Sequence, residues 1–211
     1  MTTLGDAEAL GGDDDLPAVL GAPVQSPEER RAAGRERRQT TPRRAHSAWE
    51  PPGDRRDPVE LLIDQSAGRV PELVPVRNTR MLQSAFTFYR GSALQMALDL
   101  AATPSSGIDV QLCGDAHLLN FGIFASPERA LMFDLNDFDE TGPGPFEWDV
   151  KRLAASAVIA ARDLGMSVAD QTAAAQGAAA AYRTWMARYS EMTHLDVWYA
   201  RLAAASLLDL M

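Results

Sequence analysis

Cysteine, lysine and histidine are scarce in this 211-residue chain, which has one Cys, one Lys and three His. A single cysteine, Cys113, excludes an intramolecular disulfide and a zinc site built on several cysteines. No apolar run approaches the roughly 20 residues that a transmembrane helix needs. The segment Met1–Leu20 is acidic where a signal peptide would be basic. We therefore expect a cytoplasmic protein with no membrane contact.

Basic charge is carried almost entirely by arginine, with nineteen Arg against Lys151 alone, and the formal net charge is −9. A general nucleic-acid-binding protein needs a basic face, so this balance argues against that class. The hydrophobic fraction of 46% is ordinary for a globular protein and is enough to build a core. At this length the chain accommodates one domain, with or without a tail.

Residues 1–50 are predicted to form a disordered tail, because they are rich in Gly, Asp, Pro, Arg and Glu and show no sustained apolar period. One ordered domain is predicted over residues 55–211. It begins near Asp57-Pro58, a dipeptide typical of a helix start. Four apolar residues are expected on the buried side of this helix: Val59, Leu61, Leu62 and Ile63.

Further helices are predicted over residues 92–102, 146–164, 168–190 and 194–210, the third of them with Ser167 as its N-cap. Pro71 and Pro75 predict an extended segment before these helices. The aromatic residues of the last two helices are expected to belong to the core: Trp185, Tyr189, Trp198 and Tyr199.

Short strands are predicted in the middle of the chain. Ile108–Cys113 is one strand candidate, and residues 121–124 and 130–133 predict a β-hairpin closed by Ser126-Pro-Glu-Arg129. Gly142-Pro-Gly-Pro145 predicts a rigid turn. The expected fold class is therefore α+β, mostly helical, with short strands and a hairpin that carries the site.

A polar loop, Cys113-Gly-Asp-Ala-His-Leu-Leu-Asn120, follows the first strand candidate. Asp115 and Asn120 have the spacing of the Asp and Asn in a kinase catalytic loop. Phosphoryl transfer uses such an Asp to accept or orient a hydroxyl proton, and such an Asn to hold a metal ion. We predict these roles for Asp115 and Asn120. His117 is predicted to be structural, with its ring bonding backbone carbonyls and holding Asp115 in place.

Three aspartates follow in Phe133-Asp-Leu-Asn-Asp-Phe-Asp-Glu140, interleaved with apolar residues. Close carboxylates repel unless a cation relieves them, and Mg²⁺ commonly takes one or two carboxylates plus substrate phosphates. Asp134, Asp137 and Asp139 compete for the second ligand position of Mg²⁺ or Mn²⁺. The distance from Asn120 favours Asp134, whereas the distance back from Trp148-Asp149 favours Asp137.

The two motifs resemble those of aminoglycoside-phosphotransferase-like kinases, with Cys113 in place of the first His of their His-Gly-Asp-x-His-x-x-Asn loop. The resemblance implies the large lobe of a protein-kinase-like fold, ATP as co-substrate, and a supporting contact from Asp149 to the catalytic loop. Asp139 and His117, like Asp149, are expected to support the site structurally rather than to act in catalysis.

A closer resemblance, over about residues 55–211, is to the DUF2252 family of bacterial proteins. It rests on the two motifs above and on three more: Leu73-Val-Pro-Val-Arg77, Phe86-Thr-Phe-Tyr-Arg-Gly91 and Trp148-Asp-Val-Lys-Arg-Leu153. This resemblance implies a longer chain whose later half carries a Gly-rich segment and a Lys-containing strand. We therefore expect a fragment that lacks the phosphate cover. In that case its exposed aromatic surface would favour self-association.

No Gly-rich phosphate loop or Lys precedes Asp115, although a kinase site needs both. Arg77, Arg80 and Arg90 are candidate substitutes, and Arg90-Gly91 is favoured because glycine lets a backbone approach phosphate closely.

The sequence thus favours a kinase-like phosphotransferase that acts on a nucleotide and an unidentified small-molecule hydroxyl acceptor. Two alternatives stay open. One is a pseudokinase that binds nucleotide without catalysis. The other is a metallophosphatase, which the small number of His residues disfavours. The choice between ATP and GTP is not determined by the sequence.

Overall fold

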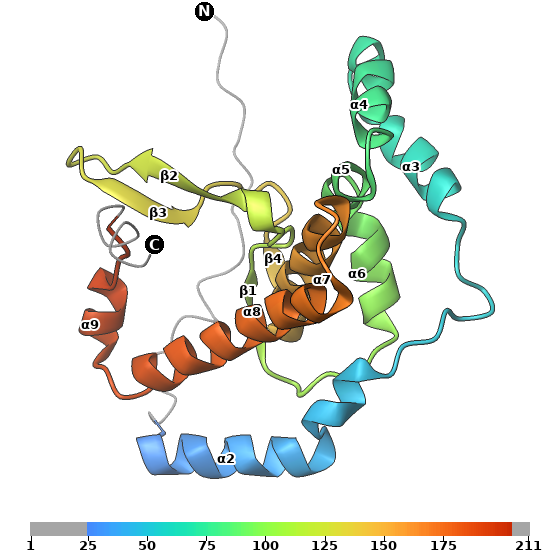
Figure 1. Ribbon diagram of the computed structural model, residues 1–211. Helices are drawn as coiled ribbons and strands as arrows, with labels where there is room; N and C mark the ends of the chain where they lie inside the picture. The colour runs from blue at the N-terminus through green and yellow to red at the C-terminus, as the bar shows by residue number, and fades with distance from the viewer. Residues whose placement is uncertain (1–24, 204–211) are drawn as a thin grey trace, which may run out of the picture. The chain divides into compact units, whose positions relative to one another are not determined.

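A computed structural model describes residues 25–203 and shows an α+β fold that is mostly helical (Figure 1). The chain divides between Glu36 and Arg37 into two units, and the candidate site lies within the second. The helices and 3-10 turns are, in chain order, α2 (Pro27–Thr40), η1 (Arg43–Ser47), α3 (Pro58–Ser66), η2 (Pro71–Leu73), α4 (Val74–Met81), α5 (Ala85–Arg90), α6 (Ala93–Ala101), η3 (Leu118–Asn120), α7 (Glu147–Asp163), α8 (Val168–Tyr189) and α9 (His194–Tyr199). The strands are β1 (Asp109–Leu112), β2 (Phe121–Ala125), β3 (Leu131–Leu135) and β4 (Gly142–Pro145).

Several predicted helix starts are confirmed by their capping bonds. The Asp57 side chain accepts hydrogen bonds from the N–H groups of Val59 and Glu60 at the start of α3. Ser167 caps α8 by accepting a bond from the Asp170 N–H at 3.2 Å. On α3, however, the predicted buried side is only partly correct, because Leu61 is buried whereas Val59 and Ile63 are exposed.

The segment expected to be disordered contains helical structure within its described part. Ser26 and Glu29 form a reciprocal capping pair at the start of α2, with Pro27 at its first position. Acidic residues in the first turn and basic residues in the last turn match the helix dipole. This helix buries none of its side chains, which is why an apolar period did not reveal it. The expectation for residues 1–24 lies outside the described residues.

The prediction of an extended segment at Pro71 and Pro75 is wrong. Each proline stands in the first turn of a helix, η2 and α4, where its missing N–H leaves no hydrogen bond unmade. The chain therefore runs as two short helices toward Arg77 and Arg80 rather than as an extended arm.

The hairpin prediction is confirmed, whereas the predicted Gly-Pro turn is wrong. Strands β2 and β3 pair antiparallel, with Phe121 opposite Leu135. Gly142–Pro145 is not a turn but strand β4, which pairs antiparallel with β1. A strand at the edge of a two-stranded sheet tolerates proline, because only one side of it needs ladder hydrogen bonds.

The last helix is shorter than predicted. Helix α9 ends at Tyr199, and the following residues approach β3, where the Phe133 N–H donates to the Leu202 carbonyl at 2.9 Å. The aromatic side chains expected in the core are largely at the surface, with Trp198 82% exposed and Trp185 44% exposed. Residues 204–210 of the predicted helix lie outside the described residues.

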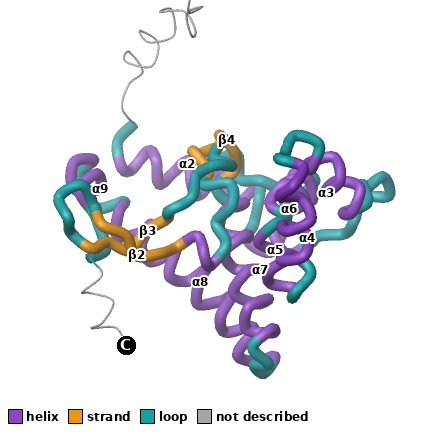
Figure 2. Tube along the Cα trace, turned by 90° about the horizontal axis from the view of Figure 1, so that it is seen from above, coloured by secondary structure: helices purple, strands orange, loops and turns teal. Residues whose placement is uncertain are grey.

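Helix α7 is the central element of the second unit. Helix α8 packs along it, and α5, α6 and η3 also contact it (Figure 1 and Figure 2). Its buried residues are mostly polar: Glu147, Arg152, Ser156 and Ala161. Within residues 25–203, no helix combines the length and apolarity needed to cross a membrane.

We expect Ser156→Ala to destabilise the fold by about 1–3 kcal/mol, because it leaves a buried N–H without an acceptor. Ser156 is fully buried, and its hydroxyl accepts a 2.9 Å hydrogen bond from the Leu118 N–H. Urea unfolding measures the effect. Ser190→Ala is a matched control, since that exposed hydroxyl donates only to a carbonyl of its own helix. Equal changes for the two variants would contradict the proposed anchoring of the loop by Ser156.

Candidate functional site

The loop between β1 and β2 carries Asp115, His117 and Asn120, and all three are buried. Gly114 has a φ of +86°, a conformation that residues with a Cβ rarely adopt. A Cβ at this position would also overlap the carbonyl oxygen of Glu140. Glycine is therefore required at position 114, and it brings the second acidic motif against the loop.

Helix α7 anchors this loop through side chains on successive turns. Asp149 accepts hydrogen bonds from the Cys113 N–H at 2.7 Å and the Gly114 N–H at 3.1 Å. Burial raises the pKa of Asp149, although the two N–H groups act in the opposite direction. The predicted contact of Asp149 with the loop is therefore present as a pair of backbone hydrogen bonds.

Arg152 forms a buried ion pair with Asp115. Its Nε donates to Asp115 Oδ1 at 2.7 Å, and its Nη2 lies 2.6 Å from the same oxygen. The guanidinium also donates to the Tyr89 carbonyl at 2.7 Å and lies over the Tyr89 ring. Arg152 is only 2% exposed, so this pair holds one oxygen of Asp115 in a fixed position and leaves Oδ2 for other partners.

The ring of His117 supports the loop differently from the prediction. Its Nδ1 accepts a hydrogen bond from the Leu119 N–H at 3.1 Å, so the ring proton of the neutral form is on Nε2. Nε2 lies 3.8 Å from Asp115 Oδ2, which is longer than a hydrogen bond. Burial lowers the pKa of His117, with Asp115 opposing and Arg152 adding to this effect.

The hairpin brings Asn120 and Asp137 together at the end that lies away from its turn. Asn120 precedes β2, and its carbonyl accepts a bond from the Asn136 N–H at 3.0 Å. Asp137 is the next residue, and its carbonyl lies 3.5 Å from the Cys113 thiol, the donor in that bond. The Asn120 amide donates to the Asp115 carbonyl at 2.6 Å, which directs its other atom, Oδ1, away from that carbonyl.

The other two carboxylates lie outside this arrangement. Asp134 is an exposed β3 residue whose side chain accepts from the N–H of Leu135, and it does not line the cleft described below. Asp139 is also exposed and absent from the cleft lining; its N–H donates to Asp137 Oδ1 at 3.2 Å. Of the two alternatives for the metal ligand, the structure brings only Asp137 to the same cleft as Asn120.

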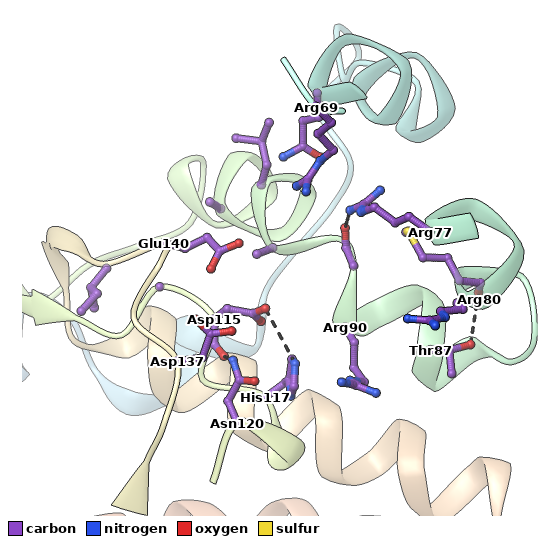
Figure 3. Close-up of a pocket in the computed structure, with 18 of the residues that line it drawn as sticks. Arg69, Arg77, Arg80, Thr87, Arg90, Asp115, His117, Asn120, Asp137 and Glu140 are labelled. Carbon is purple, nitrogen blue, oxygen red and sulfur yellow. Dashed lines mark hydrogen bonds and ion pairs between the residues drawn. The ribbon is translucent and has the colours of Figure 1, made fainter. Parts of the chain in front are cut away.

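These residues form one wall of a cleft of about 1100 Å³. On this wall lie Asp115, His117, Asn120, Asp137 and Glu140, which we call the acidic wall (Figure 3). Burial, followed by the charges of Asp115, Asp137 and Asp139, raises the pKa of Glu140. The concentration of negative charge on this wall favours a cation in the cleft.

Arginines from α3 to α5 line the other side of the cleft, and Figure 3 shows them across from the carboxylates: Arg69, Arg77, Arg80 and Arg90. Gly91 also lines the cleft, but its open side is occupied by Met81, whose sulfur would lie 2.6 Å from a Cβ at this position. The close approach that glycine allows here is therefore made to Met81, while the Gly91 carbonyl accepts a 2.6 Å bond from Arg77.

Three residues of the site were missed by the sequence analysis. Arg152 lies three residues after Asp149, so helical spacing alone would have placed both on the same face of α7. Glu140 is the last residue of the acidic motif and received no role, because its proximity to Gly114 depends on the pairing of β4 with β1. Arg69 comes from the segment after α3, and no local pattern connects it with the loop.

The donor set fits a hard divalent cation only in part. Among residues 25–203, no group of three or more His, Cys, Asp or Glu side chains is arranged to hold a metal ion. Asn120 and Asp137 offer an amide oxygen and a carboxylate, which are ligand types that Mg²⁺ accepts when substrate phosphates complete its coordination. A metal ion here would therefore depend on a phosphate-bearing ligand.

The comparison with protein families identifies the chain. A family model described as "Uncharacterized protein conserved in bacteria (DUF2252)" matches residues 69–210. The chain belongs to the DUF2252 family. The match covers the whole acidic wall and all four arginines of the cleft. No curated protein and no solved structure matches the chain.

We expect Arg152→Met to destabilise this DUF2252 protein by about 3–5 kcal/mol, because it leaves Asp115 as a buried charge without its partner. The double variant Asp115→Asn/Arg152→Met removes both charges and should recover part of the loss, with a coupling energy of at least about 1 kcal/mol. Urea unfolding of the four proteins in this double-mutant cycle measures both quantities.

The exposed pair of Arg56 and Asp64 provides a control, because solvent screens it. Arg56→Met should leave the unfolding midpoint nearly unchanged. If Arg152→Met is no more destabilising than Arg56→Met, the ion pair does not hold the loop.

Proposed function

We propose that this protein is a kinase-like phosphotransferase that moves a phosphoryl group from a nucleotide to a hydroxyl acceptor. The observation that carries the proposal is the position of Asp115, Asn120 and Asp137 on one wall of one cleft. In phosphoryl transfer, one carboxylate orients the attacking hydroxyl, while an Asn and an Asp hold the metal that bridges the phosphates. The resemblance of both motifs to those of aminoglycoside-phosphotransferase-like kinases supports the same assignment.

Asp115 would orient the acceptor hydroxyl and receive its proton through Oδ2. Oδ1 is already bound by Arg152, and Oδ2 is 3.8 Å from His117 Nε2, so it has capacity for a substrate hydroxyl. Because Arg152 fixes the carboxylate and Asn120 bonds the Asp115 carbonyl, the proton acceptor is held before substrate arrives.

Asn120 and Asp137 would hold Mg²⁺ or Mn²⁺ together with the nucleotide phosphates. When bound, such an ion neutralises the charge that develops on the transferred group. Arg90, which faces the cleft beside His117, would contact the same phosphates (Figure 3). The pairing of Phe121 with Leu135 places both residues at the same end of the hairpin, with Asn120 directly before β2 and Asp137 two residues after β3.

Thermal unfolding with and without Mg·ATP tests the proposal. A ligand present at 100 times its dissociation constant stabilises the folded state by about 2.7 kcal/mol, which raises Tm by several degrees. We expect this shift in the unmodified protein and its loss in Asp137→Asn. Asp134→Asn is the matched control, since it removes an exposed carboxylate from the same hairpin without altering the cleft. An unmodified protein that Mg·ATP does not stabilise would contradict the proposal.

A nucleotide-binding module without catalysis is the second candidate, and the Arg152–Asp115 pair is the observation that favours it. A carboxylate whose oxygen is already occupied by a guanidinium has fewer positions for a substrate proton. Single-turnover incubation with radiolabelled ATP and a mixture of alcohol, sugar and sugar-phosphate acceptors separates the two. The catalytic proposal expects label transfer that Asp115→Asn abolishes, while the second candidate expects stabilisation by Mg·ATP without any transfer.

A further inference from the structure

The cleft carries a second set of charged groups that the proposed reaction leaves unused. Besides Arg90, three arginines line it: Arg69, Arg77 and Arg80, which we call the arginine wall. Arg77 and Arg80 lie one helical turn apart on α4, and Arg69 precedes that helix (Figure 3). Because these side chains are basic and those of the other wall are mostly acidic, the two walls can bind different chemical groups.

No carboxylate among residues 25–203 forms an ion pair with the arginine wall. Over residues 25–203, neither Arg69 nor Arg80 has a carboxylate within salt-bridge distance. Arg77 uses Nη2 to bond the Gly91 carbonyl, while its Nη1 is buried and has no hydrogen-bond partner among the described residues. A buried guanidinium N–H without an acceptor is costly, so the described residues leave the hydrogen-bonding capacity of Arg77 incompletely used.

The electrostatic environment of Arg77 also favours an anion in the cleft. Burial lowers the pKa of Arg77, and the positive charge of Arg69 lowers it further, with Glu140 acting in the opposite direction. Two guanidinium groups in each other's field repel unless an anion lies between or beside them. A guanidinium fork matches the oxygens of a phosphate group in charge and in geometry.

We infer that the arginine wall binds a phosphate monoester carried by the acceptor, so that the acceptor is itself a phosphorylated small molecule. The acidic wall repels phosphate unless a metal ion is present, whereas the arginine wall attracts it without one. The claim that the ligand is the acceptor rests on the proposed function, whereas the claim that the arginine wall binds phosphate can be tested alone. The alternative source of the same chemistry is the phosphate chain of the nucleotide.

Calorimetric titration without divalent metal, in EDTA at constant ionic strength, tests the site. The probes are inorganic phosphate, glucose 6-phosphate, glucose and ATP. We expect inorganic phosphate and glucose 6-phosphate to bind and glucose not to bind. Arg80→Gln should weaken phosphate binding about tenfold, because it removes a charge-assisted hydrogen bond. Arg183→Gln is the matched control, an exposed arginine of α8 outside the cleft.

Arg77→Lys provides a second variant, in which a single amine replaces the guanidinium fork, and it should weaken phosphate binding while circular dichroism shows that the fold is retained. The phosphate site would be overturned if neither inorganic phosphate nor glucose 6-phosphate bound. It would also be overturned if Arg80→Gln and Arg183→Gln bound phosphate equally well. Metal-free binding of ATP that is lost in Arg80→Gln, without binding of glucose 6-phosphate, would overturn the assignment to the acceptor.

Failure of the proposed function gives a different result. In that case Mg·ATP would not stabilise the protein, but glucose 6-phosphate would still bind and Arg80→Gln would still weaken it. Asp137→Asn should bind phosphate at least as well as the unmodified protein, since it removes negative charge from the opposite wall.

Discussion

The geometry of the cleft depends on the contact between one face of α7 and the loop that follows β1. Asp149, Arg152 and Ser156 lie on successive turns, and each binds a different part of the loop: two backbone N–H groups, the Asp115 carboxylate and the Leu118 N–H. Because the three side chains are fixed to one rigid helix, the loop cannot move at one point without breaking a buried bond at another. The orientation of Asp115 is thereby set by a helix and not by its own loop alone.

This contact has an energetic cost that a purely structural loop would not require. The described interior contains as many buried polar residues as apolar ones, and most of the polar ones lie at the loop or on α7. A buried ion pair contributes little net stability compared with apolar side chains of the same size. Burial raises the pKa of Tyr89 to about 12, so its hydroxyl remains protonated and donates to the Arg152 carbonyl at 3.0 Å. Such an arrangement fixes position rather than maximising stability, as expected of a site.

Sequence reasoning succeeded where the signal is local. The caps at Asp57 and Ser167, the hairpin and the long helices are each encoded within a few residues, and they were predicted from those residues. It failed where pairing or burial is decided at a distance. Gly142–Pro145 becomes a strand only because β1 lies beside it, and the prolines of η2 and α4 begin helices only in context. Within the site, the polar motifs marked the acidic wall, but the pairing of Arg152 with Asp115 and the place of Arg69 on the cleft depend on tertiary structure.

The use of arginine rather than lysine is consistent with a cleft whose two walls carry opposite charges. The single lysine, Lys151, bonds Thr103 at 3.1 Å and does not line the cleft, so every cation facing the carboxylates there is an arginine. Lysine loses its charge readily when it is desolvated, whereas a guanidinium keeps its charge and offers several donors in a fixed plane. Arg77, partly buried with one N–H unpartnered, could therefore stay charged where a lysine would not. In the proposed reaction, a divalent metal ion bound with the nucleotide phosphates would neutralise the acidic wall, and the phosphate of the acceptor would neutralise the arginine wall.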